Sequence, residues 1–297
     1  MHKSGFINIL GRPNVGKSTL LNALMGEKMS IITSKPQTTR HRIIGLLSTD
    51  DYQMVFSDTP GIIYEPTYKM QDAMNSFAYS VLEDADVLLF VTDIYEKYDK
   101  DDPVFNKIRK VKVPKLLIIN KVDQIKPEQK VAHDGFWDEM ELFDEKMYIS
   151  AKEKINVDVL MDKLVAHLPE GPAYYPKDQL SDKPERFFVS EIIREKILEQ
   201  YKQEIPYSTE VIVTEFKEKE SAKGAIIHIF AEIYVSRKTQ KSIIIGKQGA
   251  AIKQLGTSAR ISIEEFLDSK VYLELYVRIK DNWRNDDKWL KQFGYKN

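Results

Sequence analysis

The stretch GRPNVGKS, residues 11–18, decides the fold of the first half of this chain. Its spacing, Gly-x4-Gly-Lys-Ser, is that of a phosphate-binding loop, in which glycines let backbone amides curl around a phosphate group. The apolar run FINIL at 6–10 precedes the loop, and the helical pattern STLLNALMG at 18–26 follows it. Strand, turn and helix in this order are the context that such a loop requires. The alternative is a glycine-rich strand–helix turn without a ligand.

Apolar runs and helical patterns alternate around this loop. They predict an α/β domain with a mostly parallel six-stranded sheet and helices on both faces. Only the three residues TDD separate the second and third strands, which indicates a hairpin and one antiparallel strand. The strand candidates are 6–10, 43–48, 52–57, 86–92, 115–120 and 146–150, and the amphipathic segments are 70–82, 102–111 and 156–168.

The order of elements changes after a proline-rich stretch. PEGPAYYPKDQLSDKPER, at 169–186, contains four prolines and reads as a linker. A small α+β unit with antiparallel pairing is predicted beyond it: helix 188–203, strands 209–217 and 225–235, a helix–turn–helix at 241–266, strand 271–280 and a short helix at 286–293. We therefore expect an α/β domain at 1–170, a linker at 171–186 and a second domain with a carboxyl-terminal helix at 187–297.

Composition sets outer limits on the function. The chain of 297 residues has no cysteine, which excludes disulfides and thiolate metal sites and agrees with a cytoplasmic location. No apolar run approaches the roughly 20 residues needed to cross a bilayer, and the amino terminus lacks the long apolar segment of a secretory signal. Residues 1–184 carry a net charge of −4 and residues 185–297 a net charge of +3.

Several residues near the loop have predicted roles in phosphate and metal binding. Lys17 would reach the β- and γ-phosphates, and the Ser18 hydroxyl would bind Mg²⁺. SDTPG at 57–61 follows a strand, which places Asp58 to hold Mg²⁺ through water and the Gly61 amide to contact a γ-phosphate. Read alone, Asp-Thr-Pro-Gly is only a favourable turn.

The stretches NKVD at 120–123 and SAK at 150–152 indicate guanine. Guanine presents N1–H and an exocyclic amino group side by side, and the Asp123 carboxylate can accept from both, whereas adenine lacks this pair of donors. Asn120 would frame the loop, Lys121 would lie over the base, and the Ala151 amide would donate to O6. A buried carboxylate left unpaired by the wrong base costs several kcal/mol.

Taken in order, these motifs resemble the G domain of translation-factor-related GTPases. The remaining motif of that family would be QTTRH at 37–41, where Thr38 or Thr39 reaches Mg²⁺ when GTP is bound; we favour Thr39. The predicted metal ligands are Ser18, Thr38, Thr39 and Asp58, and the predicted catalytic residues are Asn14, Lys17, Thr39 and Gly61. The predicted nucleotide-binding residues are Gly11, Arg12, Pro13, Asn14, Val15, Gly16, Lys17, Ser18, Thr19, Asp58, Thr59, Pro60, Gly61, Asn120, Lys121, Asp123, Ser150, Ala151 and Lys152.

One departure from the family pattern concerns catalysis. Ile62 and Ile63 follow DTPG, where many small GTPases have a glutamine that orients the attacking water. We therefore expect slow intrinsic hydrolysis. GTPases with Pro-Asn in the loop, here Pro13 and Asn14, resemble a group in which the asparagine carbonyl helps hold K⁺ beside the phosphates. The alternative is that Asn14 only stabilises the loop.

The second half contains IIIGKQGAAIK at 243–253, within a stretch, 237–260, that has six Lys/Arg and no acid. The Gly-x-x-Gly sequence resembles the loop of a KH domain, which clamps single-stranded RNA. The alternative is a simple turn between two helices. The residues expected to bind RNA are Ile244, Ile245, Gly246, Lys247, Gln248, Gly249, Ile252 and Lys253. Spacing leaves open whether Arg194 and Arg278 are ordinary solvated side chains.

A G domain followed by one KH domain of the bacterial type resembles the Era family, bacterial GTPases of small-subunit ribosome assembly. The supporting residues are GRPNVGKSTLLNALMG, QTTRHRIIG, DTPGI, NKVD, SEIIREKI and IIIGKQGAAIK. The resemblance implies GTP/GDP and Mg²⁺ as cofactors, and binding to the 16S rRNA near its 3′ end within the 30S subunit. It also implies peripheral association with the inner membrane, and we expect a monomer.

Two other classes of protein compete with this interpretation. One is a GTP-driven membrane or protein-targeting switch whose second domain binds protein; the acid-free basic stretch around Gly246 argues against it. The other is a phosphate-loop kinase, which NKVD and the lack of a substrate-domain insertion oppose.

Overall fold

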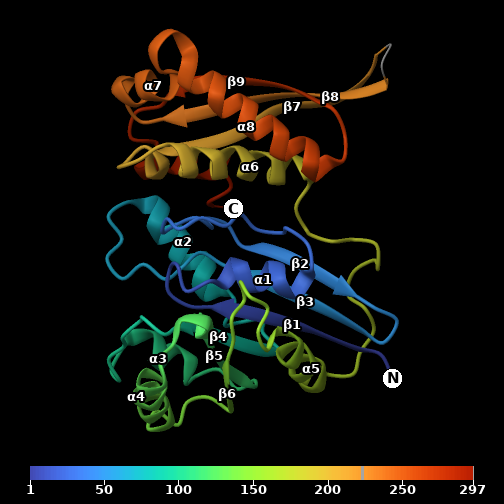
Figure 1. The fold of residues 1–297 in the computed structure, drawn as a ribbon, viewed down its shortest axis with the longest axis vertical. Coiled ribbons are helices and arrows are strands. Elements are labelled where there is room, and N and C mark those ends of the chain that lie inside the picture. The colour runs from blue at the N-terminus through green and yellow to red at the C-terminus, as the bar shows by residue number, and fades with distance from the viewer. Residues whose placement is uncertain (222–223, 297) are drawn as a thin grey trace. The chain divides into compact units, whose positions relative to one another are not determined.

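In the computed structural model, which describes residues 1–221 and 224–296, the internal contacts divide the chain into two units (Figure 1). The first unit comprises Met1–Ser30, Thr39–Pro66 and Met74–Asp182. The second comprises Ile31–Thr38, Thr67–Ala73 and the chain from Lys183 onward. Two short segments from the amino-terminal half therefore belong to the second unit.

The first unit is built on a six-stranded sheet in the order β2-β3-β1-β4-β5-β6. Only the β2–β3 pair is antiparallel, which confirms the predicted fold class and hairpin. Because the remaining pairs are parallel, the motifs that follow β1, β3 and β5 meet at one edge of the sheet. The strands are β1 (Lys3–Leu10), β2 (Ile43–Ser48), β3 (Tyr52–Asp58), β4 (Val87–Asp93), β5 (Lys115–Asn120) and β6 (Glu145–Tyr148).

Helices cover both faces of this sheet. Helix α1 (Lys17–Met25) contacts α5 (Val157–His167) and packs on β2 and β3. On the other face, Leu88, Phe90, Leu117 and Ile119 pack with α3 (Pro103–Ile108) and with Trp137 of α4 (Pro127–Asp138). Helix α4 lies in a segment for which the sequence predicted no element, and α2 (Lys69–Ser80) matches its prediction closely.

The stretch predicted as a linker, 171–186, is divided between the two units. Its residues up to Asp182 belong to the first unit. Gln53 Oε1 accepts hydrogen bonds from the amides of Tyr174 (2.7 Å) and Tyr175 (3.0 Å), and Ser181 forms a bridge with Gly45 on β2. Most of this stretch is therefore tied to the sheet rather than free of it.

The second unit contains a three-stranded sheet in the order β7-β8-β9. The β7–β8 pair is antiparallel, as predicted, but β8 and β9 are parallel, so the predicted antiparallel pairing does not extend to β9. The helix–turn–helix between β8 and β9 is long enough to return the chain to the same end of the sheet, which a parallel pair requires. The elements are α6 (Glu185–Gln200), β7 (Thr209–Ser221), β8 (Gly224–Val235), α7 (Lys238–Ile245), α8 (Ala250–Leu267), β9 (Val271–Ile279) and α9 (Asp287–Gln292).

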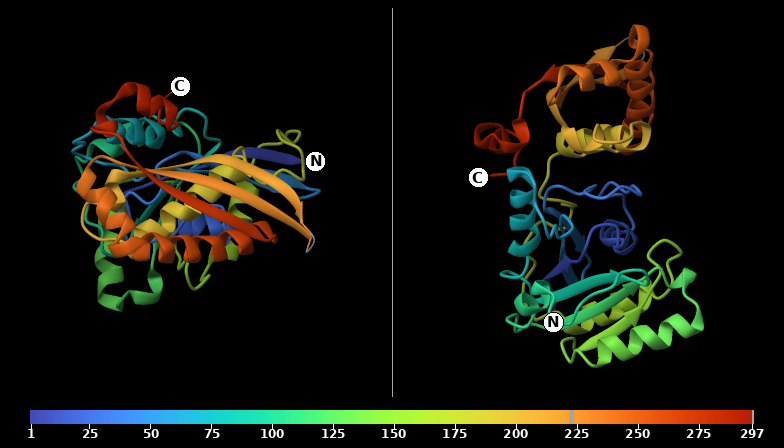
Figure 2. Two further views of the ribbon diagram at one scale, coloured as in Figure 1. Left: turned by 90° about the horizontal axis from the view of Figure 1, so that it is seen from above. Right: turned by 90° about the vertical axis from the view of Figure 1, so that its left-hand side faces the viewer.

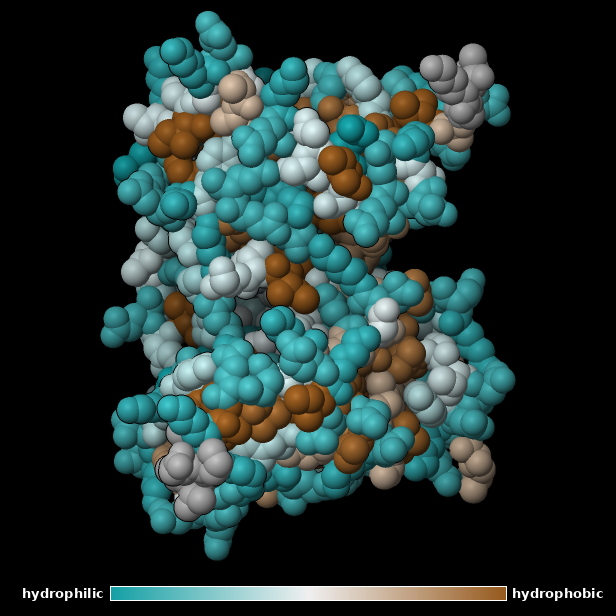
Figure 3. All heavy atoms as spheres, in the orientation of Figure 1, coloured by the Kyte–Doolittle hydropathy of each residue, from teal (hydrophilic) through white to brown (hydrophobic). Residues whose placement is uncertain are grey.

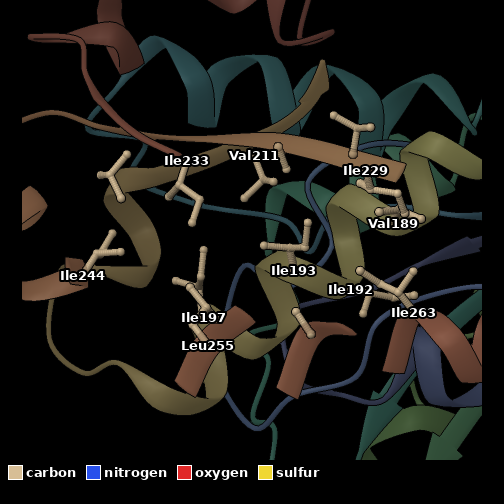
Figure 4. Packing of buried hydrophobic residues seen from close by; sticks show 14 of the residues in the cluster. Val189, Ile192, Ile193, Ile197, Val211, Ile229, Ile233, Ile244, Leu255 and Ile263 are labelled. Atoms are coloured by element: carbon tan, nitrogen blue, oxygen red, sulfur yellow. The ribbon is translucent and has the colours of Figure 1, made fainter. Parts of the chain in front are cut away.

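Helices α6, α7 and α8 share one core with this sheet. Figure 4 shows Ile193 and Ile197 of α6 directed toward Leu255 of α8 and Ile233 of β8, and all four side chains are fully buried. The strands and helices of the unit surround the space that this core fills (Figure 2). The unit thus has its own hydrophobic core, which is what an independently folded domain needs.

The carboxyl-terminal residues pack within the same unit. The Trp283 indole is fully buried and donates to the Ser208 carbonyl at 3.1 Å. Tyr234 on β8 contacts Trp289 and Phe293, with ring centroids 5.4 and 5.1 Å away. The predicted final helix is therefore part of the fold of the second unit.

Most of the surface in view is hydrophilic, and hydrophobic residues form separate patches (Figure 3). Within the described ranges, the helices are too short or too polar to cross a membrane.

Candidate functional site

The turn between β1 and α1 forms the predicted phosphate loop. Gly16 has φ 95°, and a Cβ atom there would lie 2.2 Å from Asn120 Nδ2, so only glycine fits. Helix α1 begins directly after it, with its amino-terminal amides at the loop. A helix amino terminus next to curled backbone favours an anion.

Lys17 is buried inside this loop. Its Nζ donates to the carbonyls of Gly11 (3.1 Å) and Arg12 (2.9 Å). Burial lowers the pKa of Lys17 to about 8, since the charged form is poorly solvated there. A buried ammonium group that donates to two backbone carbonyls is well suited to pair with a phosphate oxygen.

Three predicted metal ligands meet beside the loop. Ser18 Oγ lies 2.7 Å from Asp58 Oδ2 and 2.8 Å from Thr39 Oγ1. Asp58 is fully buried, burial raises its pKa, and its Oδ1 is without a hydrogen-bond partner in the described parts of the chain. Two hydroxyls around a buried carboxylate with an unsatisfied oxygen fit a hard cation such as Mg²⁺.

Thr38, the other candidate in QTTRH, lies elsewhere. Its Oγ1 donates to the Lys35 carbonyl at 2.7 Å and lies 2.7 Å from Thr33 Oγ1. The structure therefore brings Thr39, and not Thr38, to Ser18 and Asp58.

Asn120 ties the guanine motifs to the phosphate loop. Its Oδ1 accepts from the amides of Lys121 (2.8 Å) and Ala151 (3.0 Å), and its Nδ2 donates to the Val15 carbonyl (2.9 Å). The side chain is 3% exposed, so these bonds form in a protected environment. Asn120 thus fixes the relative positions of three motifs that are far apart in the sequence.

Asp123, three residues after Asn120, is exposed. A hydrogen bond with Ser150 lowers the pKa of the Asp123 carboxyl below its ordinary value, so the group is ionised at neutral pH. The Lys121 ammonium bonds to the Asn14 carbonyl at 2.8 Å and to the Asp93 carboxylate. An exposed, ionised carboxylate is therefore available at Asp123 as a hydrogen-bond acceptor.

The Arg12 side chain is directed away from the phosphate loop. Its guanidinium forms ion pairs with Glu96 and Asp102, each at 2.9 Å, and lies 4.0 Å from the centre of the Tyr98 ring. Tyr64 contacts the same group, through a bond to Arg12 Nε at 3.2 Å. Only the Arg12 backbone therefore takes part in the loop, through the carbonyl that accepts from Lys17.

The other predicted nucleotide residues lie near the same edge of the sheet. Gly61 packs against Pro13 with no room for a Cβ atom, and the Thr59 hydroxyl donates to the Ile9 carbonyl at 2.8 Å. Ser150 and Ala151 are buried next to Asn120, while Lys152 is largely exposed. Val15 is fully buried, and its carbonyl accepts from Asn120. Thr19 lies on α1, and Pro60 follows β3.

The Gly-x-x-Gly turn of the second unit is exposed, and each of its two glycines is required for a different structural reason. A Cβ atom at Gly246, where φ is 72°, would lie 2.6 Å from Ala251 Cβ, so the helices α7 and α8 approach too closely for a side chain. Gly249 has φ 79° with open space around it. Lys247 and Gln248 between them are exposed. The turn can therefore admit a ligand to its backbone.

The expected role of Ile244 in RNA binding needs correction. Ile244 is fully buried in the core, and its carbonyl accepts from the Tyr201 hydroxyl at 2.9 Å. Ile243, which the prediction omitted, is 51% exposed. Ile245 and Ile252 are partly buried against the core, and Lys253 is exposed. Successive helical residues are about 100° apart, so only one of the three isoleucines can face the core fully.

Comparison with known proteins agrees with both halves of this description. The family model described as 50S ribosome-binding GTPase matches residues 6–121, and the KH domain model matches residues 204–284. The GTPase ERA1, chloroplastic, of Zea mays is 45% identical over 297 residues, covering 99% of this chain and 71% of that protein. The GTPase Era of Clostridium kluyveri is 46% identical over 299 residues, with both chains fully covered.

Two solved structures share the whole fold. One is Era in complex with MgGDPNP and nucleotides 1506–1542 of 16S ribosomal RNA, with a TM-score of 0.93, 37% identity and full coverage of both chains. The other is an Aquifex aeolicus Era variant bound to GDP·AlF4⁻, with a TM-score of 0.92 and 36% identity over 99% of this chain and 100% of that chain. With such identity along its full length, this chain belongs to the Era family of GTPases.

Proposed function

We propose that this protein is a Mg²⁺-dependent GTP switch whose KH unit binds single-stranded 16S rRNA, near its 3′ end, during assembly of the 30S subunit. The observation that carries the proposal is the exposed Gly246–Gly249 turn in a stretch of six cations and no acid. The similar Era structure that contains 16S rRNA nucleotides supports the identity of the RNA.

Residues of the first unit have separate roles in binding GTP. Lys17 neutralises the β- and γ-phosphates, and Asp123 selects guanine. Ser18, Thr39 and Asp58 would hold Mg²⁺, which when bound neutralises charge that develops on the phosphate oxygens. The Gly61 amide contacts the γ-phosphate, so loss of that phosphate releases the segment that follows.

Hydrolysis should be slow without assistance, because Ile62 and Ile63 follow Gly61, where many small GTPases have a glutamine that orients the attacking water. Ile62 is 2% exposed and has no polar atom to offer. We propose that K⁺, held with help from Asn14, supplies additional positive charge beside the phosphates. Asn14 is exposed, with φ 62°, at the outer side of the loop.

The RNA assignment is tested by fluorescence anisotropy with a labelled RNA matching the 3′ end of 16S rRNA. Lys247→Glu should weaken binding about tenfold or more, because it replaces a phosphate contact with repulsion, and the affinity should fall steeply with salt. Lys270→Glu is a matched control, since Lys270 is 81% exposed but lies outside the basic stretch. Equal effects of both variants, or binding that salt does not weaken, would contradict the proposal.

The setting of this activity is also proposed. We propose a monomer in the cytoplasm that acts on the 30S subunit and associates peripherally with the inner membrane, as the family resemblance implies. Sedimentation of the purified protein tests the monomer, and fractionation of cells tests the location.

A further inference from the structure

Residues 31–38, which precede Thr39, are attached to helix α6 within the second unit. The Ile32 amide donates to Glu195 Oε1 at 3.2 Å. The Lys35 ammonium donates to the carbonyls of Leu198 and Tyr201, at the carboxyl end of α6. Carbonyls at the end of a helix lack partners within the helix and favour a cation. The segment is therefore fixed to α6 at two places.

The same segment is braced internally. Lys35 donates from its amide to Thr33 Oγ1 at 3.1 Å, and the Thr38 hydroxyl donates to the Lys35 carbonyl at 2.7 Å. These bonds close residues 33–38 into a small loop. Movement of α6 would thus carry Thr38 with it.

Arg194 of α6 makes the third attachment. Its side chain is fully buried, its Nε donates to Glu191 Oε1 at 2.8 Å, and its Nη2 donates to the Thr38 carbonyl. Burying a cation is costly unless it is paired and hydrogen-bonded. Glu191 and this carbonyl are the partners of Nε and Nη2, while Nη1 has no hydrogen-bond partner among the described residues. Arg194 is therefore not a solvated surface residue, a question that its spacing in the sequence left open.

The Thr38 carbonyl and the Thr39 amide belong to one planar peptide group. Fixing the Thr38 carbonyl therefore fixes the plane of this peptide group and restricts the orientation of the Thr39 backbone. The Thr39 side chain reaches the proposed metal site, where its Oγ1 lies 2.8 Å from Ser18 Oγ. We infer that Arg194 is a positioning residue for GTP hydrolysis, which sets Thr39 through the Thr38 carbonyl. This inference rests on the proposed role of Thr39 at Mg²⁺.

Through Arg194, helix α6 would take part in the switch between the GTP-bound and GDP-bound states. The helix supplies Val189, Ile193 and Ile197 to the KH core, so it is integral to the RNA-binding unit. Because any such coupling is reciprocal, a change in α6 would alter the nucleotide site, and nucleotide exchange would alter α6.

The test compares GTP turnover in the full-length protein and in two variants. Glu191→Gln with Arg194→Met removes both members of the buried pair together, so that neither is left without the other. The buried Glu210 carboxylate, which also lies near Arg194, keeps its hydrogen bond from the Tyr295 hydroxyl at 2.6 Å. Arg194→Lys keeps a cation beside Glu191 but lacks the guanidinium's second donor arm. Arg278→Met is the control, since it removes an arginine–glutamate ion pair, with Glu232, that joins the neighbouring strands β8 and β9.

The double variant should lose about tenfold in kcat, equivalent to about 1.4 kcal/mol, and Arg194→Lys about threefold or more. KM for GTP should change less than kcat, because Lys17 and Asp123 are untouched, and the Mg²⁺ concentration for half-maximal turnover should rise several-fold. A merely structural role for Arg194 would leave that Mg²⁺ dependence unchanged. Unchanged kcat and Mg²⁺ dependence in a variant that melts cooperatively would overturn the inference; if the double variant does not fold, Arg194→Lys decides.

Thr39→Ala separates this inference from the proposed function. If Thr39→Ala slows Mg²⁺-dependent turnover and the Arg194 variants do not, the positioning role alone is wrong. If Thr39→Ala has no effect, the assignment of Thr39 to Mg²⁺ is wrong, and the inference falls with it.

Discussion

Replacing Asp123 by Asn should change which base the protein accepts. Asp123 is ionised, and its carboxylate can accept two hydrogen bonds from guanine. Hydrogen bonds to charged groups are worth about 1.5–3 kcal/mol each. Asparagine keeps one acceptor but turns an NH₂ group toward a guanine donor, so at least one bond is lost.

The expected loss follows from the exposure of this residue. Since Asp123 is exposed and water competes for it, we take the lower end of that range, about 1.5 kcal/mol, for the lost bond, and up to as much again for the weakening of the second bond. The sum of about 1.5–3 kcal/mol corresponds to roughly 10- to 100-fold weaker GDP binding. Xanthine has a carbonyl in place of the guanine amino group, and the Asn amide can donate to it. The variant should therefore bind XDP more tightly than GDP, reversing the natural preference.

Isothermal titration with GDP and XDP in Mg²⁺ measures both effects. Asp162→Asn, at an exposed position on α5, makes the same chemical change away from the site. GDP binding to Asp123→Asn within threefold of the parent, with no gain for XDP, would refute the assignment of Asp123 as the residue that selects guanine.

Three further perturbations test other parts of the account. Gly249→Ala should destabilise the protein by roughly 1–2 kcal/mol, the cost of a left-handed backbone conformation. Gly246→Ala should cost clearly more, because its Cβ atom would in addition clash with Ala251. Equal losses of stability in thermal unfolding would contradict this. Asn120→Ala removes three hydrogen bonds, two of them buried, worth about 1 kcal/mol each or about 3 kcal/mol together, and should weaken GDP binding by up to roughly 100-fold. Near-normal affinity would show that Asn120 does not organise the site. GTP turnover should be faster in KCl than in NaCl at equal ionic strength, and equal rates would remove the proposed role of Asn14.

The sequence predicted the elements of the fold well where motif and periodicity agreed. The strands of the first sheet and the helices on either side of Gly246 lie within a few residues of their predicted bounds. Helix α4 was not predicted, because Gly135 interrupts its helical pattern and because the large apolar side chain Trp137 comes only at its carboxyl end. The direction of β9 could not be read from its alternation, since the same residues suit parallel and antiparallel pairing.

The site was predictable as a set of motifs but not as a set of contacts. The sequence places Thr38 and Thr39 side by side, and only the fold separates them, with Thr39 at Asp58 and Thr38 on α6. Arg12 belongs to the phosphate loop, yet its side chain is directed away from the loop, because it forms ion pairs with Glu96 and Asp102. Arg194 gave no signal, because a buried arginine and a solvated one occupy the same kind of helical position.

The central claim is that bound nucleotide controls how tightly the KH unit holds RNA. The most direct measurement is the dissociation constant of the 16S 3′-end RNA with a non-hydrolysable GTP analogue and with GDP, at one salt concentration. A coupling of about 1–3 kcal/mol predicts binding roughly 5- to 150-fold tighter with the GTP analogue. A single dissociation constant for both nucleotides would contradict the account.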